Sequence, residues 1–293
     1  IKCHPYIYPE MQAIINNNLS DFDHNIFKHI GHISRNKIRY ILLHLTNGLI
    51  YQAGNFSFTG KYQRKLALVS AHFAYLSDCA LILFGGGLKR KESLNGRFGD
   101  VLSYMYFATA ILKRFKYEGQ IKEDKIFAEY ALQYCFAQIH IGFSEIYRNF
   151  GSGFVGILFN YVMGPFYKLN SVGKNPKDKL TFKITKFICR DSKTRDRHTN
   201  NIFTSKDPKE ITCKLEDALQ LIGKCEAAQQ KIKQAIRTKK IEKNLRNDFQ
   251  ILYNKKIISL TERDKLIKLE ALRNDIIQVD SFAVKDYLKH NLA

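Results

Sequence analysis

The sequence predicts an all-α protein, and three observations support this prediction. Apolar residues recur at steps of three and four over long stretches, as they do along one face of a helix. No stretch shows the convincing alternation of apolar and polar residues that indicates a strand. Glycine and capping residues stand where such helices would begin and end. With 293 residues, 45% of them apolar, the chain can bury a sizeable core.

Three long helices are predicted in the first half of the chain. The first follows Thr59, and Gly85 stands where a left-handed C-terminal cap is needed. Ser93 is predicted to cap the second helix, which ends before Gly119. The third runs over about residues 122–150. The apolar face of the first helix consists of Leu66, Val69, Phe73, Leu76, Ala80 and Leu83.

Residues 85–91 combine three glycines with Lys89, Arg90 and Lys91, which at first sight resembles a phosphate-binding loop. Such a loop needs a strand before it, so that the next helix points its N-terminus at the anion. Here a helix is predicted to precede the glycines, and no G-x-x-x-x-G-K-[ST] motif follows. The sequence therefore favours a turn between two helices, with the basic residues left on the surface.

The chain changes character at residues 169–207, where a polar, turn-rich and basic segment predicts an irregular linker or lobe. Residues 169–206 hold ten lysine and arginine residues against three aspartates. Helical patterning returns afterwards: Asp207 is predicted as a cap, Pro208 as the first helical residue and Glu210 as its capping partner. A second such start is predicted at 261–264. Residues 208–293 therefore form a predicted helical subdomain.

Residue spacing predicts no catalytic, cofactor-binding or metal-binding residue. His29 and His32 are three residues apart and could share a helix face as metal ligands. No carboxylate or cysteine accompanies them at a matching spacing, so the sequence favours ordinary histidines. The six cysteines lie far apart without a C-x-x-C pair, which argues against a zinc ribbon and indicates a reducing compartment.

The net charge of +20 is compatible with an anionic partner, either a membrane surface or a nucleic acid. A composition rich in Lys, Ile and Asn is also what an A+T-rich genome produces, and that origin requires no partner. No apolar run reaches the roughly 18 to 20 residues that a membrane-spanning helix needs. The segment 154–166 is apolar but shorter, which leaves a core helix or an interfacial segment as alternatives.

Several stretches together resemble one known family. "IKCHPYIYPEMQA", "FKHIGH", "GGGLKRKESLNGRFGDVLSYMYFATAILKRF", "TRDR", "LEDALQLI" and "VDSF" follow each other as in the C-terminal third of bacterial long-chain acyl-CoA dehydrogenases of the FadE type. The resemblance runs from Ile1 to about Tyr287, and the block at 85–115 is its most specific part. Gly96 departs from the family, which has alanine there; a helical glycine costs about 0.5 to 1 kcal/mol.

The resemblance implies a fold and an activity. Residues 1–58 would end the catalytic helical bundle, and residues 59–293 would form an extra helical domain, divided into a long-helix core (59–168), the basic segment (169–207) and the subdomain 208–293. The family uses FAD to oxidise long-chain acyl-CoA in fatty-acid β-oxidation, with a glutamate in an E-G motif as the base. That motif would precede the stretch matching "IKCHPY". Glu10 is not followed by glycine, so the role is not carried over to it.

The resemblance also implies partners and a location. These are long-chain acyl-CoA, an electron acceptor, a second copy in a homodimer and the anionic inner face of the bacterial cell membrane, with the chain in the cytoplasm. No nucleic acid is expected under this interpretation. The alternative is a non-catalytic basic helical module that binds membrane or nucleic acid. The residues proposed to contact a membrane are Lys89, Arg90, Lys91, Phe154, Leu158, Phe159, Lys174, Lys177, Lys179, Lys183 and Lys186.

Overall fold

The computed structural model describes residues 4–51, 56–151, 157, 172–189 and 192–279, and in these ranges it contains helices and turns but no strand. The all-α prediction is confirmed. The chain divides into two compact units, residues 1–181 and 182–293, which are described separately below. The helices on the two sides of the expected boundary at 58/59 pack together, and the boundary itself stays a prediction.

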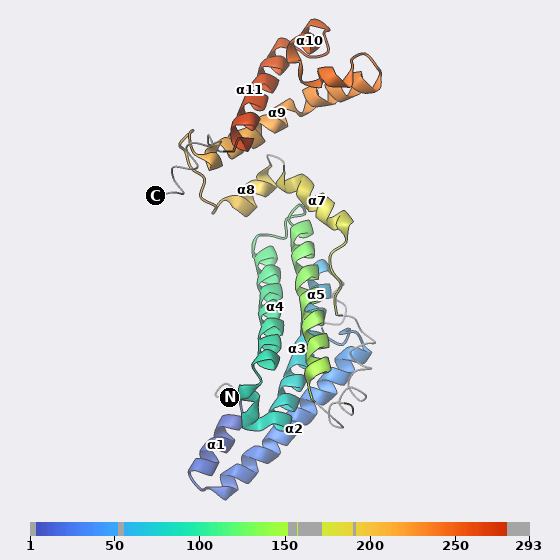
Figure 1. Ribbon diagram of the computed structural model, residues 1–293. Coiled ribbons are helices and arrows are strands. Elements are labelled where there is room, and N and C mark those ends of the chain that lie inside the picture. The colour runs from blue at the N-terminus through green and yellow to red at the C-terminus, as the bar shows by residue number, and fades with distance from the viewer. Residues whose placement is uncertain (1–3, 52–55, 152–156, 158–171, 190–191, 280–293) are drawn as a thin grey trace, which may run out of the picture. The chain divides into compact units, whose positions relative to one another are not determined.

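Each helix of the first unit packs on the next along the chain, and α4 and α5 run side by side (Figure 1). The helices are α1 (Ile7–Ile15), α2 (Leu19–Leu45), α3 (Phe58–Phe84), α4 (Glu92–Tyr117) and α5 (Lys125–Asn149). Two of them begin at side-chain caps: Asn18 accepts from the backbone N–H of Asp21, and Ser57 accepts from that of Gly60. These caps satisfy backbone donors that lack a partner within the first helical turn.

The chain reverses at the glycine run, as the sequence predicts. Helix α3 ends at Gly85, whose positive φ of 49° suits a residue without a Cβ. A short 3-10 helix, η1 (Gly85–Arg90), leads into α4. The predicted cap at Ser93 is wrong: Lys91 occupies the cap position of α4 without a side-chain hydrogen bond. Because a helix enters the glycines, a phosphate-binding loop of the strand–loop–helix kind is excluded here.

Aromatic and aliphatic side chains from α2 to α5 form the core of the first unit. Tyr40, Leu76, Val101 and Phe136 are among its fully buried members. Helices α4 and α5 approach closely at Gly142, where a Cβ would lie 2.6 Å from Cγ2 of Val101. An alanine at this position would therefore force the two helices apart or move Val101.

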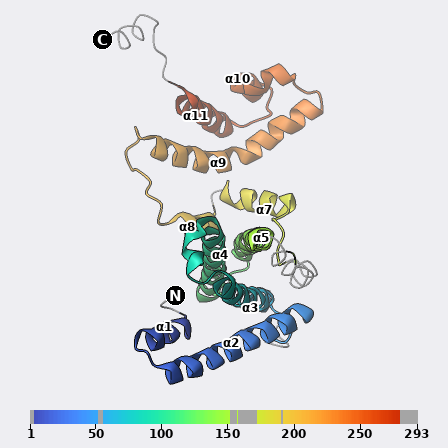
Figure 2. The same ribbon diagram turned by 60° about the horizontal axis from the view of Figure 1, so that its bottom comes forward.

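The second unit has its own core, formed between α9, α10 and α11. Its helices are α8 (Lys193–Thr199), α9 (Ile211–Arg237), the 3-10 helix η2 (Lys243–Asn247), α10 (Phe249–Asn254) and α11 (Leu260–Ile277), seen from a second direction in Figure 2. Helix α11 begins with a capping box between Ser259 and Glu262, two residues before the predicted start at Thr261. The predicted start of α9 at Asp207 is also wrong, because that carboxylate accepts instead from the backbone N–H of Lys209 in a turn.

The segment predicted to be irregular contains two helices in its described part. Helix α7 (Asp178–Ile188) spans the division between the two units, and α8 follows it. Within the second unit, Arg195 of α8 makes a bidentate contact with the Glu216 carboxylate at 2.9 and 2.6 Å. This contact helps to fix α8 against α9, because a planar guanidinium holds both carboxylate oxygens at once.

One stretch, residues 58–90, is long and apolar enough to cross a membrane by length and composition alone. This finding corrects the expectation that no such stretch exists. Charged residues interrupt the stretch, but the mean hydropathy of its most apolar window, 1.7, is high enough for a membrane span. Half of its most apolar window is buried within the structure. A buried core helix passes the same test, so the finding is weak evidence for a membrane span.

Candidate functional site

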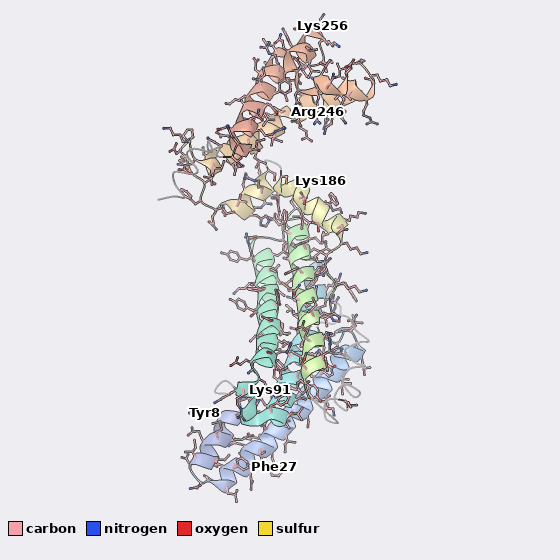
Figure 3. All side chains as sticks on the ribbon, in the orientation of Figure 1. Tyr8, Phe27, Lys91, Lys186, Arg246 and Lys256 are labelled. Atoms are coloured by element: carbon pink, nitrogen blue, oxygen red, sulfur yellow. The ribbon has the colours of Figure 1, made fainter. Side chains whose placement is uncertain are left out.

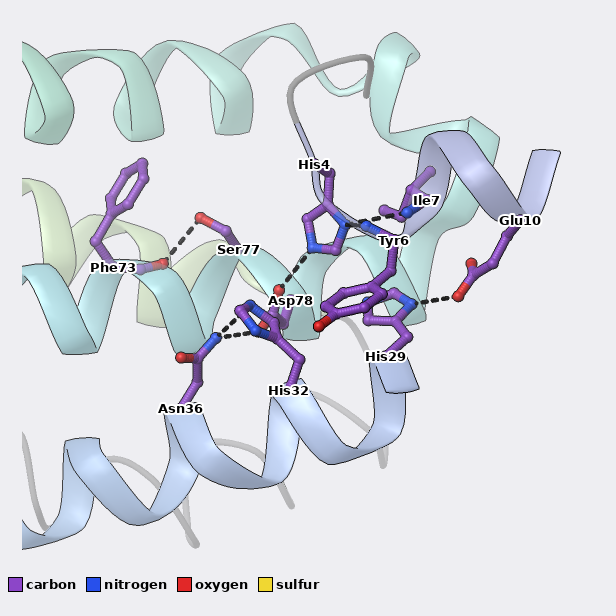
Figure 4. A network of polar contacts seen from close by, with 10 residues as sticks. All are labelled: His4, Tyr6, Ile7, Glu10, His29, His32, Asn36, Phe73, Ser77 and Asp78. Atoms are coloured by element: carbon purple, nitrogen blue, oxygen red, sulfur yellow. Dashed lines mark hydrogen bonds and ion pairs between the residues drawn. The ribbon is translucent and has the colours of Figure 1, made fainter. Parts of the chain in front are cut away.

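Six polar side chains meet where α1, α2 and α3 converge, and we refer to them as the histidine–carboxylate cluster (Figure 4). Helix α2 presents three of them at helical spacing, α3 and α1 supply the two carboxylates, and one histidine precedes α1. The cluster consists of His4, Glu10, His29, His32, Asn36 and Asp78.

Asp78 lies at the centre of the cluster and is only 3% exposed. Its Oδ1 lies 3.2 Å from Nε2 of His4, and its Oδ2 accepts from Nδ2 of Asn36 at 2.9 Å. The same Asn36 amide lies 3.0 Å from Nε2 of His32. A buried carboxylate needs such donors, because an unpaired charge in this environment is costly.

His4 has a defined tautomer. Its Nδ1 faces the backbone N–H groups of Tyr6 and Ile7, at 3.3 and 3.2 Å, and can only accept from them. The ring proton therefore sits on Nε2, which donates to Asp78. Burial lowers the pKa of His4, against the opposing effect of the hydrogen bond to Asp78. His4 is thus a neutral donor that joins the start of α1 to α3.

His29 has one ring nitrogen in use and one without a partner. Its Nδ1 lies 2.8 Å from Oε1 of Glu10 and donates to that carboxylate. Its Nε2 is buried and has no hydrogen-bond partner in the part of the chain that the structure describes, while the whole residue is 8% exposed. The Tyr6 ring stacks against the His29 ring at 5.7 Å, and the His4 ring lies 4.8 Å away. In the neutral ring this nitrogen carries a lone pair, and its burial keeps that lone pair away from water.

The sequence predicted His29 and His32 as ordinary histidines because no carboxylate or cysteine accompanies them at a matching spacing. The structure brings carboxylates to them from other helices, Asp78 from α3 and Glu10 from α1. Glu10, to which no catalytic role was assigned, orients His29. The helical spacing of His29, His32 and Asn36 was the one available signal, and it could not identify partners that lie far away in the sequence.

The described residues among the predicted membrane contacts are all exposed. Lys89 and Arg90 end η1, and Lys91 precedes α4 with its Nζ 4.6 Å from the Phe84 ring centroid. Lys174 and Lys177 precede α7, which carries the other lysines. Figure 3 labels Lys91 and Lys186. The remaining three predicted contacts, Phe154, Leu158 and Phe159, lie outside the described residues.

Each unit also contains a large cavity. In the second unit a cavity of about 510 Å³ lies between α9 and α11, and leucine and isoleucine side chains dominate its lining, with Arg246 and Arg273 among the polar residues. In the first unit a cleft of about 450 Å³ is lined in part by Arg39, Lys113 and Lys116. The apolar cavity does not suit the pyrophosphate of FAD, and exposed cations alone do not define a dinucleotide site. We therefore assign no FAD-binding residue in the described part of the chain.

The comparison with known families gives one match that covers nearly the whole chain. The family described as "Acyl-CoA dehydrogenase, C-terminal, bacterial type" matches residues 1–282. No solved structure matches the chain.

Proposed function

Because the chain belongs to the bacterial-type acyl-CoA dehydrogenase C-terminal family, we propose that it is the C-terminal portion of an FAD-dependent enzyme that oxidises long-chain acyl-CoA in fatty-acid β-oxidation. The family match over residues 1–282 carries this proposal. The motif at 85–115 supports it, since that block is the most specific part of the resemblance to long-chain enzymes. Acyl-CoA, an electron acceptor and a second copy of the chain are the partners that the proposal includes.

We propose that residues 1–293 have no dehydrogenase activity by themselves. The base in the family is a glutamate in an E-G motif, and Glu10 does not lie in such a motif. The Glu10 carboxylate is also held by His29 Nδ1 at 2.8 Å, with its side chain 14% exposed. An acid–base residue must reach a substrate proton directly or through one water. A carboxylate committed to an internal histidine is poorly placed for that role.

The activity proposal is tested with purified residues 1–293, palmitoyl-CoA and an artificial electron acceptor. We expect no flavin absorbance and no turnover, because loss of a positioned base alone lowers the rate by about 10² to 10⁴. Stoichiometric FAD together with turnover would show that the base lies within this chain. The DNA upstream of the Ile1 codon tests the proposed origin from a whole enzyme separately: an in-frame E-G motif supports it, and a start codon without that motif favours a gene remnant or the non-catalytic module.

We also propose that the protein lies in the cytoplasm and binds the inner face of the cell membrane peripherally. Helix α7 favours this location: it has no buried residue, and its Phe182 is 70% exposed. Lys179, Lys183 and Lys186 recur at steps of four and three and share one face of this helix. Exposed lysines beside exposed apolar side chains are typical of helices that lie in a membrane interface.

A further inference from the structure

We propose that His4, His29 and Asp78 bind one divalent transition metal ion of the zinc class, with Glu10 as the residue that orients His29. One candidate ligand atom from each of the three side chains lies within 4.8 Å of the other two. Nε2 of His4 and Oδ1 of Asp78 are 3.2 Å apart. Two ligands of a tetrahedral zinc ion stand about 3.3 to 3.6 Å apart, given metal–ligand bonds of about 2.0 to 2.2 Å, so these two atoms need to separate slightly to bind one ion.

The unpartnered nitrogen of His29 supplies independent support. His29 is 8% exposed as a residue and 11% exposed at its side chain, and among the described residues its Nε2 has no hydrogen-bond partner. Its Nδ1 donates to Glu10 at 2.8 Å, so in the neutral ring the lone pair is on Nε2. Histidine ligands of metals characteristically donate their other ring nitrogen to a carboxylate, which fixes the ring and makes the ligating nitrogen more basic. Glu10 and His29 have this arrangement.

The charge of the cluster also favours a cation. Asp78 is 3% exposed, and its two contacts are with neutral donors of His4 and Asn36. The Glu10 side chain, 14% exposed, adds a second carboxylate on the far side of His29. A buried carboxylate is stable when it is paired or bound to a metal. A divalent ion between Asp78 and the histidines would place a positive charge beside this buried carboxylate.

Coordination requires one proton to move. In the metal-free chain the His4 proton is on Nε2, whereas binding through Nε2 requires the tautomer with the proton on Nδ1. The hydrogen bonds from the N–H groups of Tyr6 and Ile7 to Nδ1 must then break. At 3.3 and 3.2 Å these bonds are long, so their loss costs less than that of shorter hydrogen bonds. No proton is released overall, since it transfers from one ring nitrogen to the other. Metal binding is therefore coupled to a change at the start of α1.

The ligand set indicates which metal and which role. Two imidazoles and one carboxylate suit zinc or cobalt rather than calcium or magnesium, which prefer oxygen ligands alone. The three ligands come from the segment before α1, from α2 and from α3. The ion would thus fasten these three segments together, with one coordination position left for water.

The test is a titration of the metal-free, untagged protein with Co²⁺, followed by visible absorption. We expect one equivalent to give the intense bands of a tetrahedral site and Zn²⁺ to displace it. Asp78→Asn and His29→Gln should each lower the affinity at least 100-fold, and Glu10→Gln about 10- to 100-fold. His24→Gln is the matched control, since His24 is exposed on the same helix, α2, and should leave binding unchanged.

A second measurement keeps the result independent of folding defects in the variants. In the unaltered protein, Zn²⁺ should shift the amide NMR signals of Tyr6 and Ile7. Once Nδ1 of His4 carries the proton, it can no longer accept hydrogen bonds from these two N–H groups. The proposal is overturned if one equivalent of Co²⁺ gives no tetrahedral bands. It is equally overturned if His29→Gln and Asp78→Asn bind as tightly as the unaltered protein, which would mean adventitious binding at surface histidines.

Discussion

His72 is a titratable side chain placed in the core of the first unit. It is fully buried, its Nε2 lies 2.7 Å from the Tyr147 hydroxyl, and its ring stacks on Phe143 at a centroid distance of 4.2 Å. Burial, and secondarily the neighbouring His44, holds the pKa of His72 well below its usual 6.5. The side chain is therefore neutral in the folded protein at any pH near neutrality.

This histidine predicts that the first unit loses stability in mild acid. In the unfolded chain His72 takes up a proton as the pH falls below about 6.5, while in the folded chain it stays neutral to much lower pH. The unfolded state then binds more protons than the folded state. The contribution of His72 to the free energy of unfolding is therefore complete above about pH 6.5, and it is lost progressively below that value. His4 and His140, whose pKa values burial also lowers, act in the same direction.

Urea unfolding at pH 7.5, 6.0 and 5.0 measures this effect. We expect the free energy of unfolding to fall as the pH is lowered. The variant His72→Gln should show a shallower dependence on pH, and the exposed His24→Gln should keep the original one. A His72→Gln variant with the full loss of stability between pH 7.5 and 5.0 would show that other groups cause it.

At the scale of helices, two glycines in α4 and α5 predict opposite effects of the same substitution. Gly96 lies within α4, and a Cβ there would meet nothing within 4 Å. Gly96→Ala should therefore raise the free energy of unfolding by about 0.5 to 1 kcal/mol, because alanine restricts the unfolded chain and favours the helix.

Gly142→Ala is the matched variant in α5. Its Cβ would lie 2.6 Å from Cγ2 of Val101, and overpacking of this kind typically costs about 1 to 3 kcal/mol. Thermal and urea unfolding of both variants provide the measurement. Equal effects of the two substitutions would contradict the packing of α4 on α5 described above.

The helices themselves were predictable from the sequence, whereas several of their ends were not. The apolar spacing of residues such as Leu76 and Val101 is local information, and it placed α3, α4 and α5 to within a few residues. The start of α9 was misplaced because Asp207 can cap either a helix or a tight turn, and only the surrounding chain selects between them. Residues 178–199 were predicted to be irregular because their charge concealed a helical pattern.

The histidine–carboxylate cluster could not be predicted at all from spacing. His4 and Asp78 are separated by 74 positions, and His29 and Glu10 by 19. Such contacts depend on how α1 and α3 pack on α2, which no local pattern records. The resemblance to acyl-CoA dehydrogenases identified the family without identifying this site.

At the scale of the whole molecule, the distribution of positive charge decides between a membrane partner and a composition effect. If α7 binds an anionic membrane, Lys179, Lys183 and Lys186 should contribute together with the exposed Phe182. Changing the three lysines to glutamine should weaken binding to vesicles containing phosphatidylserine by about 1 kcal/mol per lysine at most. Sedimentation at two salt concentrations measures this, since screening weakens the charge contribution and leaves the apolar part.

A control variant with the same change in net charge shows whether the position of the lysines on α7, or only the total charge, determines vesicle binding. Lys224, Lys233 and Lys240 are exposed in the second unit, and their replacement by glutamine should leave vesicle binding nearly unchanged. Equal losses in the two triple variants would mean that total charge, and not α7, drives the binding. A preference for DNA or RNA that disappears in high salt would favour the nucleic-acid alternative.

Within the described ranges the two hydrophobic cores have no residue in common, and this separation has a consequence for how the chain can change. Leu76 belongs to the first core and Leu252 to the second, so the partners that a substitution disturbs in one are absent from the other. Effects of mutations without shared partners usually add to within about 0.3 to 0.5 kcal/mol. Each core can therefore accumulate substitutions, or be redesigned, without compensating changes inside the other core, and the two cores can diverge at different rates.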